Sequence, residues 1–259
     1  MDNSYFYIIG YGSLLNFNSI EKTIFNLNVN EDYIHLLKQN LNNLNNLNIN
    51  KILLYEKKIR IAYVKNLKRS FCVPINYNNK ITNSWISLGA YPKKNSIINC
   101  TIFPVNKNQL IELDSREKYY KRIEINYNDI QIIKGDKLNN KIKIFCYIID
   151  KKLFKKPSLK YPILQSYIDI CIKGCLYIDF ILKNKNFEFT IKFIQNTYNW
   201  KKLKYWINDR IYSRRPYHYI NNSLIIDKLL TNYIFNEIMD FQEQEKQESE
   251  NKTTIILKD

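Results

Sequence analysis

Residues 5–15 read YFYIIGYGSLL, and this stretch decides how the rest of the chain is interpreted. Tyr5–Ile9 is aromatic and β-branched, which predicts a buried strand. Gly10, Gly12 and Ser13 then end the strand in a tight turn with little side-chain bulk. The backbone N–H groups of such a turn can form a nest that binds a carboxylate or an oxyanion. Taken alone, the pattern indicates an ordinary turn.

From Ile52 to Ile149 the chain is dominated by predicted strands. Lys107–Arg116 interrupts them with a helical pattern, and Asn16–Phe25 predicts a short helix before them. Many short strands with few helices between them predict an α+β fold built on a strongly curved mixed sheet or barrel. Short runs of Ile, Tyr, Val and Phe place these strands at Ile59–Val64, Ser70–Ile75, Ile86–Tyr91, Ile97–Val105, Tyr119–Ile125, Ile130–Ile133 and Ile142–Ile149.

After Lys151 the pattern becomes helical, with helices predicted at Ile163–Phe180, Phe187–Tyr198 and Leu224–Phe241. No flexible linker separates these segments from the strands. We therefore expect a core over residues 1–150 that carries an Asn-rich insert at 38–50. A helical C-terminal extension over 151–236 packs on this core. An acidic, disordered tail over 237–259 completes the expected organisation.

Lys and Arg outnumber Asp and Glu by 40 to 24, so the net charge is +16. A positive net charge is typical of proteins that bind nucleic acids. Asn, Ile, Lys and Tyr are all frequent here, however, so we favour a nucleotide bias in the coding sequence as the cause of the charge. His35 and His218 are the two histidines of the sequence, which argues against a histidine-based metal site. The five cysteines lack a C-x-x-C motif, which indicates reduced thiols. We found no secretory leader, membrane span or Gly-rich phosphate loop, so we expect a cytoplasmic protein without a membrane partner.

A second segment, LDSREKYYKR at residues 113–122, lies where a predicted helix meets a predicted strand. Glu117 beside the aromatic Tyr119 and Tyr120 could be a general base, because burial would raise its pKa toward neutrality. The ordinary alternative is a helix-end glutamate paired with Arg116 or Arg122.

The turn at residues 11–14 and the segment at residues 113–122 are more informative together than alone, because they occur in a fixed order with several other short motifs. This combination resembles the γ-glutamylcyclotransferase-like superfamily over about residues 5–230. The segments that carry the resemblance are Tyr11–Leu14, Lys68–Phe71, Leu88–Pro92, Phe103–Val105 with Gln109 and Leu110, and Leu113–Arg122. Gln165–Asp169, Gly174, Cys175, Trp206–Arg210 and Arg214–Tyr217 resemble the later helix and the C-terminal stretch of a bacterial-type subgroup.

The resemblance implies a small mixed β-barrel flanked by helices. It implies an enzyme that releases 5-oxoproline from a small γ-glutamyl compound, without metal or organic cofactor. The α-amine of the substrate attacks the γ-carbonyl, and the position of Glu117 matches the family's catalytic glutamate. Tyr11, Gly12, Ser13 and Leu14 match the loop that holds the γ-glutamyl group. Tyr120 and Arg122 are candidates to line the pocket, while the leaving group and the oligomeric state stay open.

A second hypothesis is an inactive member of the fold that serves as a basic binding or scaffold subunit, with RNA as a candidate partner. Its motivation is the segment 200–219, which interleaves aromatic and basic side chains. We favour the interpretation in which these aromatics pack inward and in which Asp209 and Arg210 form a buried salt bridge. A small pocket shared by Glu117 and the Gly12–Leu14 turn would favour the enzyme, and a Glu117–Arg122 pair would favour the alternative.

Overall fold

The computed structural model describes residues 5–25, 55–76, 84–211 and 223–235. The insert predicted at 38–50 and the tail predicted at 237–259 therefore lie outside the described residues. Within the described residues the chain combines one large mixed sheet with five α-helices, which confirms the α+β class. No described helix has the length and apolar character needed to cross a membrane.

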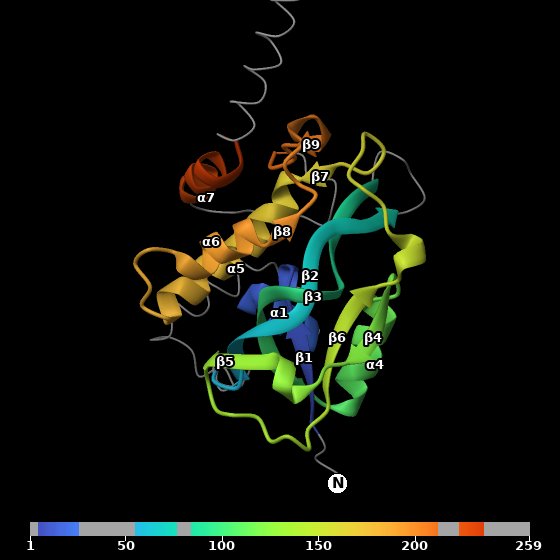
Figure 1. Cartoon of the computed structure of the whole chain (residues 1–259), viewed down its shortest axis with the longest axis vertical. Coiled ribbons are helices and arrows are strands. Elements are labelled where there is room, and N and C mark those ends of the chain that lie inside the picture. Colours follow the sequence, from blue (N-terminus) through green and yellow to red (C-terminus); the bar gives the residue numbers. More distant parts are fainter. Residues whose placement is uncertain (1–4, 26–54, 77–83, 212–222, 236–259) are drawn as a thin grey trace, which may run out of the picture.

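The large sheet has the strand order β4-β6-β1-β3-β2-β5, with β8 beside β2 (Figure 1). Its central strand β1 runs parallel to β6 on one side and antiparallel to β3 on the other. A mixed sheet in which the first strand is central explains why the opening stretch is apolar throughout. The strands are β1 (Phe6–Gly10), β2 (Arg60–Asn76), β3 (Ser84–Val105), β4 (Tyr120–Glu124), β5 (Ile130–Lys134), β6 (Ile144–Ile149) and β8 (Thr197–Tyr198).

β2 and β3 correct the sequence prediction, because four expected short strands form two long ones. The β2–β3 register shifts between Lys65 and Leu67. Asn66 and Asn95 both have a φ of 62°, a left-handed conformation that asparagine tolerates better than most residues. The polar interruptions that the sequence presents as turns are therefore irregularities inside continuous, bent strands.

The two largest of three apolar clusters meet at β1, which contributes side chains to both. Ile8 belongs to the core shared with the helices, whereas Tyr7 and Ile9 face a second core, in keeping with the alternation of side chains along a strand. Side chains of β1, β2, β3 and β6 dominate this second core, and β4 and β5 add half-buried isoleucines. The sheet thus wraps around its own core. No backbone ladder joins β4 to β5 among the described residues, so closure into a barrel is not confirmed.

Five helices accompany the sheet, and α4 (Lys107–Arg116) has the predicted bounds. α1 (Phe17–Ile24) confirms the short N-terminal helix. α5 (Gln165–Ile181) and α6 (Glu188–Gln195) lie side by side beside β2 and β3 (Figure 1). Before α5, the predicted helical residues Ile163 and Leu164 instead form β7, which pairs with β9 (Trp206–Ile207). The remaining elements are α7 (Ser223–Leu230), the 3-10 turns η1 (Ser13–Leu15), η4 (Tyr127–Asp129), η5 (Lys151–Leu153) and η6 (Leu203–Tyr205), and the π-helical turn η7 (Thr231–Phe235).

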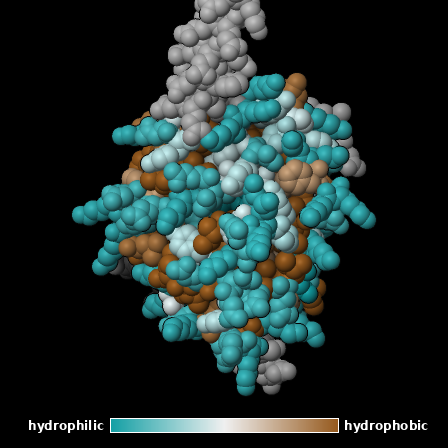
Figure 2. Space-filling view, in the orientation of Figure 1, coloured by the Kyte–Doolittle hydropathy of each residue, from teal (hydrophilic) through white to brown (hydrophobic). Residues whose placement is uncertain are grey.

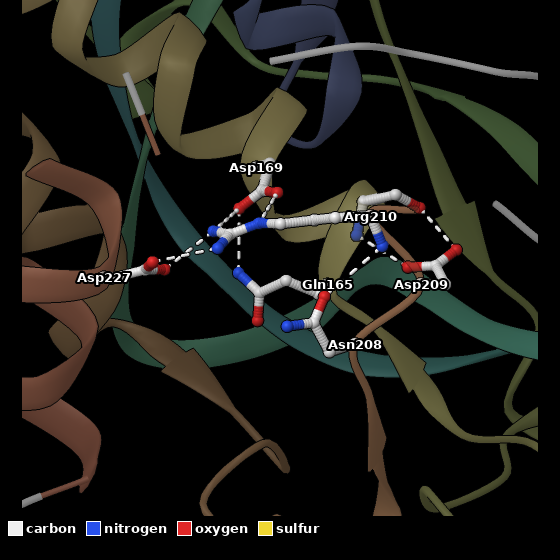
Figure 3. A network of polar contacts seen from close by, with 7 residues as sticks. Gln165, Asp169, Asn208, Asp209, Arg210 and Asp227 are labelled. Atoms are coloured by element: carbon white, nitrogen blue, oxygen red, sulfur yellow. Dashed lines mark hydrogen bonds and ion pairs between the residues drawn. The ribbon is translucent and has the colours of Figure 1, made fainter. Parts of the chain in front are cut away.

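An ion-pair network ties the C-terminal elements to the start of α5 (Figure 3). Arg210 forms a bidentate pair with the fully buried Asp169, at 2.7 and 2.8 Å, and a second pair with Asp227. Asp209 does not pair with Arg210 as the sequence suggested. It accepts hydrogen bonds from the backbone N–H and the hydroxyl of Ser166 at the beginning of α5. Both residues anchor the extension, each through its own partner on α5.

The basic and aromatic segment is partly buried where the structure describes it. Trp200 is 1% exposed and stacks between Phe71 and Trp206, which supports inward packing at this position. Hydrophilic side chains are spread over the visible face in Figure 2, with smaller hydrophobic areas between them. Residues 212–219 of this segment lie outside the described residues.

Candidate active site

The turn after β1 folds as expected into a compact 3-10 turn. Leu15 N–H donates to the carbonyl of Gly12 at 2.9 Å, and Asn16 N–H donates to that of Ser13 at 3.1 Å. The hydroxyl of Thr101 on β3 donates to the carbonyl of Leu14 at 2.7 Å and fixes the turn from the sheet. The first hydrogen bond of the turn uses the N–H of Leu15. The N–H groups of Ser13 and Leu14 come before it in the chain, so no carbonyl within the turn accepts from them.

Helix α5 packs directly against this turn because Gly174 has no side chain. A Cβ atom at Gly174 would lie 2.5 Å from the backbone nitrogen of Asn16, closer than any real contact. The N-terminal part of the same helix brings Tyr167 to Gly12, where a Cβ would lie 3.0 Å from the tyrosine hydroxyl. The apolar turn and the helix therefore form one packed unit.

Glu117 is positioned by the junction between α4 and β4. α4 begins with a reciprocal capping box between Asn106 and Gln109, and it ends where Glu117 N–H donates to the carbonyl of Leu113 at 2.8 Å. Tyr120 N–H then donates to the carbonyl of Glu117 at 2.8 Å, which turns the chain into β4. The backbone N–H and the backbone C=O of Glu117 are thus both fixed by hydrogen bonds.

A small cavity of about 50 Å³ joins these two segments. It brings together six of the seven site residues expected from the sequence, and Arg122 is not among its lining residues. Glu117 is the single carboxylate among the lining residues, which are Ile9, Gly10, Tyr11, Gly12, Ser13, Leu14, Leu88, Glu117, Tyr120, Tyr147 and Tyr167.

Arg122 contacts a different acid from the one that sequence reasoning considered. Its guanidinium lies 2.6 Å from the carboxylate of Asp114, and the Tyr147 hydroxyl donates to the other oxygen of Asp114 at 2.8 Å. Glu117 is instead approached by Arg116, with 3.3 Å between Nε and Oε1. The pairing with Arg116 is one of the two that the sequence offered as the ordinary alternative, and the pairing with Arg122 is not found. Glu117 lines the cavity while it contacts Arg116.

Burial determines the acid strength of Glu117. The carboxylate is 16% exposed, and burial raises its pKa above the ordinary value of 4.5, although Arg116 partly opposes this shift. A carboxyl group with a raised pKa is a better proton acceptor at neutral pH than an ordinary glutamate. The site therefore provides a group suited to proton transfer.

Two tyrosine hydroxyls bridge strands where the sheet curls over itself. The Tyr11 hydroxyl donates to the carbonyl of Tyr147 on β6 at 2.6 Å and accepts from the N–H of Ala90 on β3 at 3.1 Å. The Tyr120 hydroxyl donates to the carbonyl of Leu88 at 2.8 Å. Side-chain hydrogen bonds thus link β3 to β4 and β6 around the cavity, and burial raises the pKa of both phenols, which keeps them neutral.

Sequence reasoning missed five lining residues, and two of them, Tyr147 and Tyr167, carry a polar side chain. Tyr147 lies in the apolar run FCYII on β6, and Tyr167 lies in SYIDI on α5, next to Ile168. A buried tyrosine usually requires a hydrogen-bond partner, so such an isolated phenol is the signal that could have identified them. Metal chemistry has no comparable signal, because the described residues contain no group of three or more His, Cys, Asp or Glu that could hold an ion.

No family model matches the chain, and no curated protein matches its sequence. Solved structures match it at low identity. One titled γ-glutamyl cyclotransferase is 15% identical, with a TM-score of 0.39, covering 71% of this chain and 88% of that one. An uncharacterized protein from Homo sapiens is 14% identical, with a TM-score of 0.43, covering 88% and 99%.

A yeast γ-glutamyl cyclotransferase specific to glutathione is 10% identical, with a TM-score of 0.38, covering 71% of this chain and 89% of that one. Two of these three titles name the activity of the superfamily that the sequence motifs resemble. At such identities and TM-scores, the matches do not establish a family, and the bacterial-type subgroup stays a prediction.

Proposed function

We propose that this protein is a cyclotransferase that releases 5-oxoproline from a small γ-glutamyl compound. The observation that carries the proposal is the shared cavity, in which a buried carboxylate faces the turn after β1. These are the two segments whose order in the sequence resembles the superfamily, and they are 106 positions apart between Tyr11 and Glu117.

In the proposed reaction, the α-amine of the substrate attacks its own γ-carbonyl carbon. A new C–N bond closes the five-membered ring, and the bond between the γ-carbon and the leaving nitrogen breaks. Glu117 accepts a proton from the substrate ammonium group and returns it to the leaving nitrogen. The second proton that the ring nitrogen loses on becoming an amide is taken up by the released amine, so the enzyme ends in its initial protonation state. The raised pKa of Glu117 suits both transfers near neutral pH.

The turn after β1 contributes binding and charge stabilisation. Among the described residues, none accepts a hydrogen bond from the N–H groups of Gly12, Ser13 or Leu14. Such donors can hold the α-carboxylate or the oxyanion that develops at the γ-carbonyl. A cavity of about 50 Å³ suits the compact amino-acid end of the substrate. Because the attack is intramolecular, holding this end in a folded conformation supplies much of the acceleration.

The test is a product assay. The purified chain is incubated with γ-glutamyl amino acids, glutathione and γ-glutamyl-lysine, and 5-oxoproline is measured. Loss of a positioned general base costs about 10²- to 10⁴-fold, so we expect a decrease of at least about 100-fold for Glu117→Gln. Glu112→Gln on the exposed face of α4 is the matched control and should retain full activity. Absence of 5-oxoproline with every donor would contradict the proposal.

The alternative, a basic scaffold subunit that binds RNA, has one favourable observation. The Tyr198 ring is 45% exposed, and Lys68 Nζ lies 3.4 Å from its centroid, so an aromatic and a cation share the surface. The burial of Trp200 removes one of the stacking side chains that this hypothesis requires. Single-stranded RNA binding that weakens steeply with salt would favour the alternative, and no binding at low salt would exclude it.

A further inference from the structure

Arg69 on β2 is fully buried, with 0% exposure, directly behind the turn after β1. A guanidinium has five N–H donors. Here each donor has an acceptor, and all the acceptors are neutral oxygens. Nε donates to Thr197 Oγ1 at 2.9 Å, Nη1 to the carbonyls of Tyr11 at 3.3 Å and Asn99 at 3.0 Å, and Nη2 to Asn99 Oδ1 at 2.8 Å and the Phe193 carbonyl at 3.1 Å.

This arrangement buries a positive charge without neutralising it. No carboxylate in the described part of the chain pairs with Arg69, and its close ring contact is Phe193, at 4.0 Å. Burial lowers the pKa of Arg69 to about 10, which still leaves the side chain protonated at neutral pH. An unpaired buried charge is unfavourable for folding, so its persistence here indicates a use beyond packing.

The Tyr11 carbonyl that accepts from Arg69 belongs to the same peptide group as the N–H of Gly12. No described peptide bond is cis, and in a planar trans peptide the C=O and N–H bonds point in opposite directions. The carbonyl of this peptide points toward the guanidinium, so the N–H of Gly12 points away from it. Gly12 lines the cavity.

We propose that Arg69 is a positioning residue that orients and polarises the Tyr11–Gly12 peptide, so that the N–H of Gly12 receives the anionic group of the ligand. This inference rests on the proposed function and identifies the carboxylate of a γ-glutamyl ligand as the group received. A hydrogen bond to a carbonyl strengthens the N–H of the same peptide as a donor. The charge of Arg69 is fixed before the ligand arrives, so little reorganisation accompanies binding.

The experiment compares two ligands of nearly equal shape, 5-oxoproline and the neutral 5-oxoprolinamide, by calorimetry on the full chain. We expect wild-type protein to prefer the carboxylate. In Arg69→Gln the ratio of the two affinities should fall about tenfold, a loss like that seen when a residue that orients a metal ligand is replaced. Arg69→Lys keeps the charge and should restore part of the ratio.

Thr197→Val is the matched packing control. It removes the acceptor of Nε but keeps the guanidinium and its contact with Tyr11, so the ratio should stay unchanged. An equal loss of affinity for both ligands in Arg69→Gln would show a purely structural role and overturn the inference.

An NMR titration of wild-type protein tests the same point without a variant, in case Arg69→Gln fails to fold. The amide proton of Gly12 should move downfield with 5-oxoproline and stay in place with the amide. A Gly12 amide that does not respond, while neighbouring amides do, would overturn the role of Arg69 and leave the proposed function intact. Failure of wild-type protein to bind 5-oxoproline would instead contradict the proposed function, and the inference with it.

Discussion

The guanidinium of Arg210 lies between the carboxylates of Asp169 and Asp227 (Figure 3). The guanidinium of Arg69, in contrast, is surrounded by neutral oxygens. Hydrogen bonds to Asp169 are the main cause of a raised pKa at Arg210. Burial lowers the pKa of Arg69 and raises that of Glu117. The ionised form is thus favoured in the Arg210 network and disfavoured on both sides of the cavity.

The difference separates the structural use of charge in the Arg210 network from the functional use that we propose for Arg69 and Glu117. In the network of Asp169, Arg210 and Asp227, the guanidinium is paired with two carboxylates, and these pairs hold α5 to the C-terminal elements. Arg69 has no carboxylate partner among the described residues, and Glu117 is paired only with the more exposed Arg116. Burial outweighs pairing at both groups, so both charges oppose folding. Ionisable groups perturbed mainly by burial are typical of functional sites, and stability is commonly sacrificed there.

The largest expected effect on stability comes from breaking the ion pair between Asp169 and Arg210. Asp169→Asn leaves the guanidinium of Arg210 without its fully buried partner. Removing one member of a buried pair costs about 3–5 kcal/mol, so the free energy of unfolding should fall by about 3 kcal/mol or more in urea denaturation. Simultaneous replacement of Arg210 by Met should recover part of this loss. If Asp169→Asn leaves stability unchanged, the network is not a structural anchor.

The next largest effect tests whether α5 connects the Arg210 network to the turn that lines the cavity. Gly174→Ala places a methyl group against the backbone of Asn16, on the helix that also carries Asp169. Overpacking of this kind costs about 1–3 kcal/mol, and we expect a decrease near 2 kcal/mol together with weaker 5-oxoproline binding. Ser166→Ala at the other end of α5 is the control for helix destabilisation. Stability lost without any change in binding would show that the turn and the helix are independent.

The sequence predicted much of this organisation, because local patterns report local structure. The apolar run of β1 and the helical pattern of α4 predicted these two elements nearly residue for residue. The order of the motifs correctly grouped Glu117 with the Gly12–Leu14 turn. Each of these features depends on residues close together in the sequence.

Other features depend on contacts between distant residues and could not be predicted in this way. Asn66 and its surroundings resemble a turn until the β2–β3 ladder shows an irregularity within one strand. Arg122 had several acids within reach, and only the tertiary structure selects Asp114. Nothing near Arg69 in the sequence indicates a buried arginine, because its acceptors come from four other positions along the chain.

A smaller change in stability is expected for a substitution at the cavity, and this substitution should stabilise the protein. Glu117 has a higher pKa folded than unfolded, so the folded state binds more protons and stability falls as the pH rises above about 4.5. Glu117→Gln removes this penalty and should raise the free energy of unfolding by about 1 kcal/mol at pH 7. Below pH 4 both proteins carry a neutral side chain, and the difference should vanish. A variant less stable than wild type at pH 7 would contradict the functional interpretation of this charge.

The smallest effect separates the two carboxylates that share Arg210. Asp227 is 46% exposed at its side chain and Asp169 is 0% exposed, although both lie 2.7 Å from the guanidinium. Exposed pairs contribute less than about 1 kcal/mol, and added salt weakens them. Asp227→Asn should therefore cost under about 1 kcal/mol, and 1 M NaCl should remove the difference from wild type. A cost equal to that of Asp169→Asn would mean that geometry, rather than burial, sets the strength of this network.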